Sequence, residues 1–214
     1  MDAVVLLHGL WVHGAVMALM ARRIARAGYG VRSYSYPTLK LGLTENAERL
    51  ARYCRDISAP RLHFVGHSLG GLVVLRMLEL NGEARPGRVV LAATPFTGSY
   101  AANRFRRLPG GQAALGRSMV EWLAAGPRNP GSGREIGVIA GSLPLGLGCM
   151  VAPDLPRPSD GAVSVAETAV PGMADRIVLP VSHSGVLISR EVARQVCAFL
   201  RDGAFAHQEV TRDR

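Results

Sequence analysis

The stretch that decides the fold is "FVGHSLGG", residues 64–71, in which Ser68 stands between Gly66 and the pair Gly70 and Gly71. Apolar runs lie on both sides of it, so the pattern predicts a buried strand, a tight turn and a helix. Glycines suit such a turn because side chains there would collide. A Gly-x-Ser-x-Gly pattern between strand and helix is typical of a serine nucleophile raised at the end of a sheet. The alternative is a structural turn that any α/β protein could use.

The rest of the chain alternates between short apolar runs and segments with helical spacing. The predicted strands are residues 3–9, 31–37, 61–66, 88–94, 134–142 and 175–181. The predicted helices are residues 16–27, 44–57, 69–80 and 190–201. Strands that alternate with helices imply right-handed crossovers, so the sequence predicts the α/β class, with a predominantly parallel sheet of about six strands and helices on both faces.

Helix boundaries are predicted from the residues that favour them. Thr44 is the predicted N-cap of the second helix. Gly28 and Gly30 are predicted to end the first helix, and Asn81 and Gly82 to close the third.

The 214 residues fit a single domain, 1–214, with one segment that breaks the alternation, at about 97–133. This segment holds an apolar piece with helical spacing that includes Met119 and Trp122. Ligands of open α/β sheets bind beyond the carboxyl ends of the strands, where such an insertion would lie. A small cap that contacts substrate is the favoured interpretation, and a decorated crossover is the alternative.

The charge and composition limit the classes of partner. The net charge of +9 would attract anions. The arginines are spread along the chain, and the densest group, Arg104, Arg106 and Arg107, is short, so no nucleic-acid interface is expected. Attraction to acidic surfaces or anionic substrates stays open. No apolar run is long enough to span a bilayer, and no secretory signal is recognisable, so we expect a cytoplasmic protein without integral membrane association.

The three cysteines, Cys54, Cys149 and Cys197, are far apart and have no metal-ligand spacing. They are interpreted as buried thiols. Neither a metal nor an organic cofactor is expected, and the oligomeric state is not indicated.

A serine nucleophile needs a base to take its proton and a third group to orient that base. Of the six histidines, only His183 follows a predicted strand on the same carboxyl edge as Ser68 and precedes the last helix. The others lie before the serine, within a strand, beside the serine or in the polar tail. His183 is therefore the predicted general base.

Two aspartates could serve as the acid, since both follow the fifth predicted strand. Asp160 is preferred, because Gly161 permits a tight turn and the following "AVSV" can anchor the loop. An Asx-turn is the structural alternative for any Asp-Gly pair. Asp154 lies between Pro153 and Pro156 and has less reason to point into the site.

The negative charge of a tetrahedral intermediate needs two backbone N–H donors. The residue after the nucleophile is Leu69, and Leu10 follows the His-Gly pair that ends the first predicted strand. We predict these two amides as the oxyanion hole.

The chain resembles the α/β-hydrolase superfamily, in particular its small bacterial lipases and esterases. The segments that carry the resemblance are "VVLLHGLW", "FVGHSLGG", "SDGAVSV" and "SHSG", in the order oxyanion loop, nucleophile, acid and base. The resemblance implies a serine esterase that uses Ser68, Asp160 and His183 on a small acyl ester substrate. Trp11, Met119 and Trp122 are the predicted substrate contacts. Compared with larger members, we expect this sequence to lack the two leading antiparallel strands, and its insertion is too short to favour a large lid.

Other functions remain possible on these residues. A thioesterase or an acyltransferase would use the same triad. A non-catalytic binding module could have the same fold, and a phosphate-binding protein could use the glycines, although the lysine of a P-loop is missing.

Overall fold

The computed structural model describes residues 1–80, 83–126 and 133–207 and contains a six-stranded sheet in the order β2-β1-β3-β4-β5-β6. Every neighbouring pair of strands is parallel. The strands are β1 (Ala3–Leu7), β2 (Gly30–Tyr34), β3 (Leu62–His67), β4 (Val89–Ala92), β5 (Ile136–Gly141) and β6 (Asp175–Leu179). The six predicted strands and the α/β class are confirmed, and β3, which leads to Ser68, lies in the interior of the sheet.

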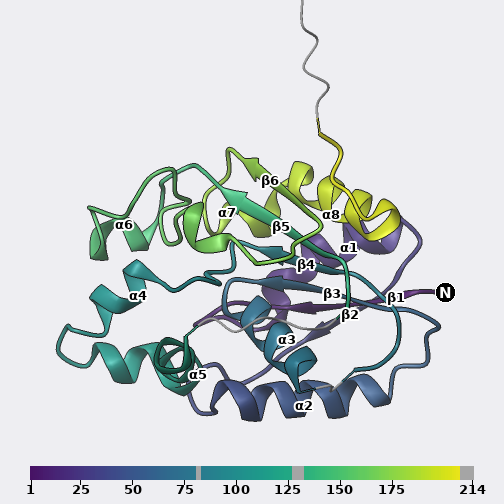
Figure 1. Ribbon diagram of the computed structural model, residues 1–214, viewed down its shortest axis with the longest axis horizontal. Helices are drawn as coiled ribbons and strands as arrows, with labels where there is room; N and C mark the ends of the chain where they lie inside the picture. The colour runs from purple at the N-terminus through teal and green to yellow at the C-terminus, as the bar shows by residue number, and fades with distance from the viewer. Residues whose placement is uncertain (81–82, 127–132, 208–214) are drawn as a thin grey trace, which may run out of the picture.

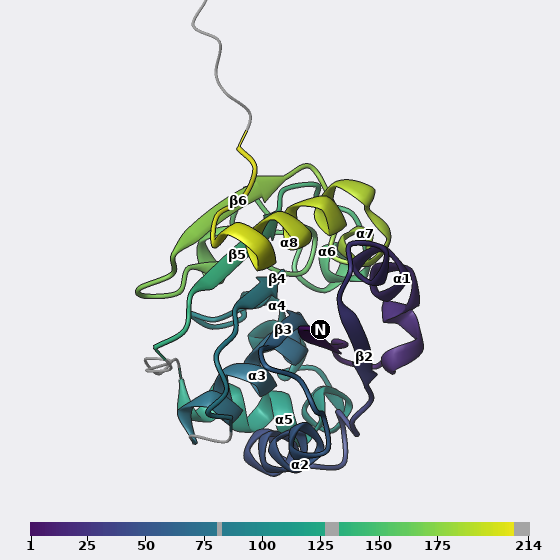
Figure 2. The ribbon, with the colours of Figure 1, turned by 90° about the vertical axis from the view of Figure 1, so that its right-hand side faces the viewer.

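Helices cover both faces of the sheet (Figures 1 and 2). The main helices are α1 (Ala18–Arg26), α2 (Leu43–Arg55), α3 (Leu69–Glu79), α5 (Gly111–Ala125) and α8 (Arg190–Asp202). The shorter ones are η1 (Gly14–Met17), α4 (Tyr100–Phe105), α6 (Leu147–Val151), η2 (Ala166–Thr168) and α7 (Gly185–Ile188). Helices α1 and α8 pack on one face, and α2, α3 and α5 lie on the other (Figure 2). No helix in the described ranges has the length and apolarity that crossing a membrane requires.

Strand β1 shows why the apolar runs are continuous rather than alternating. Val5 and Leu7 belong to the core on the α2 and α3 side, whereas Val4 and Leu6 belong to the core on the α1 and α8 side. Side chains of a strand alternate between the two faces of the sheet, and both faces here are covered. All five residues of the strand are therefore buried.

Thr44 is not the N-cap of α2, which corrects the sequence prediction. The helix begins at Leu43, and its N-cap position is held by Gly42, two residues before Thr44. Its first free amides are bound by a side chain from α5: the Glu121 carboxylate accepts from the N–H groups of Leu43 (2.7 Å) and Thr44 (3.1 Å). A carboxylate at a helix N-terminus accepts hydrogen bonds from these amides, and its negative charge is attracted to the positive end of the helix dipole.

The other predicted helix boundaries divide into three cases. Helix α1 ends at Arg26, and Gly28 follows it with φ of +94°, as expected of a glycine after a helix. Gly30 does not stop the helix, because it is already the first residue of β2. The predicted closing pair, Asn81 and Gly82, lies outside the described residues.

Within the segment 97–133, the described residues form α4 and α5. Residues 127–132 lie outside the described part of the chain. Helix α5 is longer than the predicted apolar piece and is kinked at Gly116, where φ is +74°. A side chain there would meet the main chain of Leu39 at 2.5 Å, so the kink depends on glycine. Figure 1 shows α4, α5 and α6 beyond the strand tips on the side opposite the N-terminus.

Candidate active site

Ser68 occupies a sharp turn between the end of β3 and the start of α3. Its backbone has φ of +52° and ψ of −123°, a conformation that residues other than glycine rarely adopt. The Ser68 N–H donates to the Ala92 carbonyl at 2.9 Å, and the Ser68 carbonyl accepts from Gly71 at 3.0 Å. The turn is thus fixed by the main chain on both sides, and it has the strained geometry that the sequence pattern predicts.

The three glycines of the turn are needed because main chains meet there. A β-carbon at Gly66 would lie 2.4 Å from the Cα of Gly71, and one at Gly70 would lie 2.6 Å from the carbonyl oxygens of Leu7 and His8. At Gly71 it would lie 2.1 Å from Thr94 Oγ1. Each contact is shorter than real β-carbons tolerate. The turn can therefore pack against β1 and the residues after β4 only if these three positions are glycines.

The loop after β1 lies directly against the turn. A β-carbon at Gly9 would lie 3.1 Å from the Ser68 β-carbon, so the loop that continues to Leu10 passes beside the serine at Gly9. Within the described part of the chain, neither the Leu10 nor the Leu69 amide donates a hydrogen bond. Two unused N–H groups near a nucleophile are what an oxyanion hole requires.

Contacts on both sides hold the loop after β1. The His8 ring is fully buried and stacks on Tyr36 with ring centroids 4.5 Å apart. Tyr36 also donates its hydroxyl to the His8 carbonyl at 2.8 Å. At the other end of the loop, Trp11 has φ of +63° and donates its indole N–H to the Ala114 carbonyl in α5 at 2.7 Å. The loop that carries Leu10 is therefore attached to both the sheet and the insertion.

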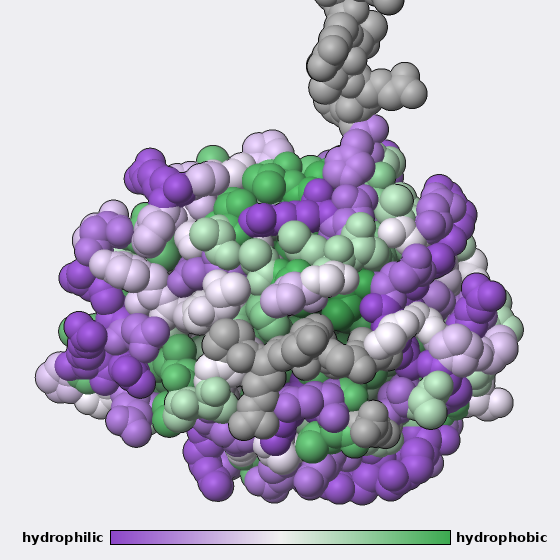
Figure 3. Space-filling view, in the orientation of Figure 1, coloured by the Kyte–Doolittle hydropathy of each residue, from purple (hydrophilic) through white to green (hydrophobic). Residues whose placement is uncertain are grey.

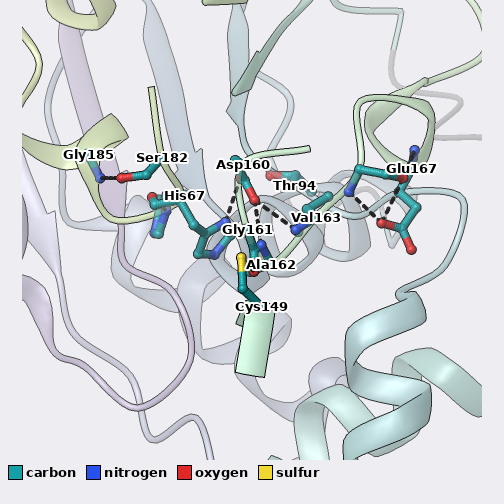
Figure 4. Close-up of polar contacts among 12 residues, drawn as sticks. His67, Thr94, Cys149, Asp160, Gly161, Ala162, Val163, Glu167, Ser182 and Gly185 are labelled. Atoms are coloured by element: carbon teal, nitrogen blue, oxygen red, sulfur yellow. Dashed lines mark hydrogen bonds and ion pairs between the residues drawn. The ribbon is translucent and has the colours of Figure 1, made fainter. Parts of the chain in front are cut away.

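Asp160 and His183 form a direct pair at the same edge of the sheet. The Asp160 carboxyl is 1% exposed, and its Oδ2 lies 2.7 Å from His183 Nδ1. Its Oδ1 accepts from the N–H groups of Ala162 (2.9 Å) and Val163 (2.7 Å), as Figure 4 shows. The His183 N–H donates to the Asp160 carbonyl at 2.9 Å. The Asx-turn and the contact with histidine, which the sequence left as alternatives, are thus present together.

Asp154 points away from this pair. Its carboxylate accepts from the Tyr100 hydroxyl (2.5 Å) and from Arg104 (2.9 Å), both in α4. The hydrogen bond from Tyr100 lowers the pKa of this exposed carboxyl group, with a further contribution from Arg104. Asp154 therefore connects the loop after β5 to α4 and does not contact His183.

His67 is the site residue whose place sequence reasoning missed. Its fully buried ring lies 4.8 Å from the His183 ring, and its Nε2 is 3.0 Å from the His183 carbonyl oxygen, to which it donates in the neutral form. Burial, with the nearby His183 ring, lowers the pKa of His67 to about 3, so the ring stays neutral near pH 7. Nδ1 has no partner within the described residues. In the sequence, the only sign of a role for His67 is that it precedes Ser68. That position does not reveal its contact with His183, which lies 116 residues later.

The other histidines have structural contacts. His13 accepts from the Ala15 N–H at the start of η1, and His63 is buried in β3 and accepts from the Arg88 N–H. His207 pairs with Asp175 at 2.9 Å, but Asp175 begins β6 and so lies at the opposite edge of the sheet. His183 is thus the histidine, of those described, that combines a carboxylate partner with the edge that holds Ser68. No hydrogen bond between the Ser68 hydroxyl and the His183 ring is present in the described part of the chain; such bonds often form only with substrate bound.

A second carboxylate fastens the loop that follows Asp160. Glu167 accepts from the Ser164 N–H at 2.7 Å, and Ser164 Oγ accepts from the Glu167 N–H at 3.3 Å. This reciprocal pair is the capping-box arrangement, which the Ser-x-x-Glu spacing would have predicted. Glu167 also accepts from the Tyr100 N–H at 2.5 Å, so it joins the Asp160 loop to α4.

The predicted substrate contacts differ in their exposure. Trp11 is 52% exposed beside the loop that carries Leu10. Met119 and Trp122 are buried in the core beneath α5, where Trp122 lies 6.0 Å from the Phe96 ring. Their contact with substrate stays a prediction. Within the described residues, no group of three or more His, Cys, Asp or Glu side chains is placed to hold a metal ion.

A family model, the alpha/beta hydrolase family, matches residues 4–179. The chain belongs to the alpha/beta hydrolase family. The match begins in β1 and ends at the last residue of β6, so it includes Ser68 and Asp160 and stops before His183. No curated protein matches the sequence.

Solved structures with this fold are distant in sequence. The mature form of a Bacillus licheniformis lipase aligns with a TM-score of 0.73 and 18% identity, over 93% of this chain and 90% of the lipase. A metagenomic carboxyl esterase aligns with a TM-score of 0.64 and 20% identity, over 85% of this chain and 64% of the esterase. RedJ, a thioesterase from the prodiginine pathway of Streptomyces coelicolor, aligns with a TM-score of 0.61 and 15% identity, over 93% of this chain and 84% of RedJ. At these identities the likeness concerns the fold.

Proposed function

We propose that this α/β hydrolase cleaves carboxylic esters through a Ser68, His183 and Asp160 triad. The observation that carries the proposal is the 2.7 Å contact between Asp160 and His183 at the edge where the strained turn holds Ser68. His183 Nδ1 is occupied by the carboxylate, which leaves Nε2 as the ring nitrogen that can take a proton from the serine.

In the proposed reaction, Ser68 Oγ attacks the acyl carbonyl carbon while His183 Nε2 takes the hydroxyl proton. The carbonyl oxygen becomes negatively charged and is bound by the N–H groups of Leu10 and Leu69. When the intermediate collapses, His183 returns the proton to the departing alcohol. Water then attacks the acyl-serine with His183 as base and releases the acid. Asp160 stabilises the imidazolium formed in both steps.

A thioester substrate is the second candidate, because RedJ is among the proteins of similar fold. Both reactions pass through the same acyl-serine, and they differ only in the leaving group. Measuring kcat/KM for matched acyl esters and acyl thioesters of equal chain length distinguishes them, with an added alcohol acceptor as the arm for acyl transfer.

The proposal is tested by labelling with a fluorophosphonate, which reacts covalently with an activated serine. We expect one adduct on the wild-type protein and none on Ser68→Ala. Ester turnover should fall by about 10⁴-fold or more in this variant, as for other triads. Ser184→Ala is the matched control: this exposed serine follows His183, and no side-chain hydrogen bond caps α7 from it, so labelling should persist.

Retention of more than about a tenth of the turnover by a folded Ser68→Ala protein would contradict a serine hydrolase. Failure of the wild-type protein to label or to turn over any ester would instead favour a binding module on this fold.

A further inference from the structure

Large apolar side chains are exposed at the edge of the sheet that holds Ser68. The connections after β1, β2, β4, β5 and β6 each leave at least one of them in water. They are Trp11, Leu39, Leu108, Leu145, Met150 and Ile188, with exposed fractions from 41% for Leu39 to 82% for Met150. We call this set the carboxyl-edge face. The left margin of Figure 3, on the side where Figure 1 places α4, α5 and α6, is mostly hydrophilic, with small hydrophobic areas between the hydrophilic side chains.

A groove of about 450 Å³ between α1 and α8 begins at this face and runs toward the opposite edge of the sheet. Five arginines line it: Arg22, Arg23, Arg26, Arg190 and Arg194. In the described part of the chain, only Arg194 has a carboxylate partner, Glu191 at 2.6 Å. The groove is therefore basic, and its positive charge favours an anionic ligand over a cationic one.

The groove adjoins the carboxyl-edge face. Arg23 donates to the main-chain carbonyl of Ile188 at 2.7 Å, so an arginine of the groove touches a residue whose side chain is 63% exposed. The groove also includes Leu19, which is 40% exposed. Charged and apolar groups are therefore presented side by side.

A second groove, of about 530 Å³, lies on the insertion and has the same mixture. Leu39, Leu108 and Val120 line it together with Arg106 and Arg117. Exposed apolar side chains therefore lie near arginines in two places, at the insertion and in the groove between α1 and α8. This arrangement, with apolar side chains among basic ones, is typical of surfaces that insert shallowly between anionic headgroups.

We propose that the carboxyl-edge face docks on an anionic lipid surface, with the groove arginines nearest that edge, Arg106, Arg117 and Arg190, binding headgroup phosphates. The apolar side chains are spread over five separate connections rather than lining one shaped groove, which suits a planar and fluid partner better than a folded one. A second copy of this chain is disfavoured because each copy carries a net charge of +9. Docking in this orientation turns Ser68 toward the lipid, and it is independent of whether the serine is catalytic.

The first test is sedimentation of the wild-type protein with vesicles. We expect binding to phosphatidylcholine vesicles that contain about one-third phosphatidylglycerol to be about tenfold tighter or more than to phosphatidylcholine alone, and to weaken as salt is added. Equal binding to both kinds of vesicle, or none, overturns the proposal. Binding of free pyrophosphate without binding of vesicles also overturns it, because the groove would then serve a soluble anion.

The second test compares two triple variants that remove the same charge. Arg106→Gln/Arg117→Gln/Arg190→Gln removes three groove arginines near the carboxyl edge, and Arg52→Gln/Arg55→Gln/Arg61→Gln removes three exposed arginines, two in α2 and one just before β3. We expect the first variant to lose most of its binding to the anionic vesicles. The second variant should lose only the smaller part of the binding that follows from the lower net charge. Equal loss in both would mean that net charge alone, and not this face, attracts the lipid.

The third test concerns the apolar side chains. Met150→Ser should weaken vesicle binding several-fold, whereas Leu80→Ser, which changes an exposed side chain after α3 at the opposite edge of the sheet, should not. The melting temperature of each variant verifies that it is folded. If the two variants bind alike, the face does not insert.

Discussion

The edge of the sheet that holds Ser68, Asp160 and His183 and the insertion that holds α4 and α5 are built in different ways. At the edge, main chains approach so closely that an added carbon at Gly70 would lie 2.6 Å from two carbonyl oxygens. The insertion is attached mainly by side chains, such as Glu121 at the start of α2 and Trp11 at Ala114. The edge therefore admits few substitutions, whereas the insertion meets the rest of the domain mainly through side chains, with Gly116 against Leu39 as an exception.

The largest expected difference between the two regions is that between Asp160 and Asp154. Asp160 lies at the edge beside His183, whereas Asp154 contacts α4 in the insertion. Asp160→Asn should lower kcat about 10⁴-fold with the fold intact, because an amide in place of the carboxylate favours the wrong tautomer of His183. Asp154→Asn should change kcat by less than about threefold, since it removes only an exposed contact with α4.

Steady-state kinetics on a short-chain ester, with circular dichroism of both variants, provide the measurement. A large effect of Asp154→Asn with a small effect of Asp160→Asn would mean that the acid is misassigned even if Ser68 is the nucleophile.

Glycine substitutions test whether close main-chain approach really distinguishes the edge. Gly70→Ala should destabilise the protein by about 3 kcal/mol or more, because the carbonyls of β1 cannot move away from the new methyl group. Gly30→Ala, in β2, is the control. Its β-carbon would have no contact shorter than 3.7 Å, so stability should change by under about 1 kcal/mol.

Urea unfolding curves give both values. If both variants lost similar stability, the close main-chain contacts at Gly70 would not explain why glycine is needed there.

The pH dependence of stability tests the buried side of the edge. The folded pKa of His67 is about 3 and lies below the unfolded value, so the unfolded chain binds the extra proton between these pKa values. Stability is therefore full above about pH 6.5 and falls as the pH falls. His67→Asn should remove up to about 2 kcal/mol of the stability lost between pH 7 and pH 5.

Urea unfolding at both pH values measures this difference. Burial also lowers the pKa of His8 and His63, so part of the pH dependence should survive in the variant. A variant with the full wild-type dependence would show that His67 is not buried in the neutral form.

The smallest expected effect comes from the insertion. Glu121→Ala removes the carboxylate from the first amides of α2 and should destabilise the protein by about 1 kcal/mol, as for other helix caps. Glu48→Ala, on the exposed side of the same helix, should be nearly neutral. Thermal unfolding compares the two, and a loss at Glu48 that equals the loss at Glu121 would indicate that helix propensity, and not capping, is responsible.

The features predicted from the sequence are those encoded by neighbouring residues. The six strands were visible as short apolar runs, and the turn at Ser68 was visible from its glycines. The placement of Asp160 beside His183 followed from one rule, that the carboxyl ends of parallel strands share an edge.

The features that were missed depend on contacts between distant parts of the chain. Thr44 looks like a helix cap, but the cap is Glu121, 77 residues later. His67 looks like a bystander of Ser68, yet it contacts His183. Helix α6 is five residues long, too short for a helical period to be recognised.

The contrast between the two tryptophans has a practical consequence. Trp11 is half exposed on the loop that carries Leu10, whereas Trp122 is enclosed in the core, and the sequence contains no other tryptophan. The protein therefore carries its own fluorophore at the mouth of the site. In a Trp122→Phe protein, the emission spectrum would come from Trp11 alone and report directly on whatever enters, moves or dehydrates that loop.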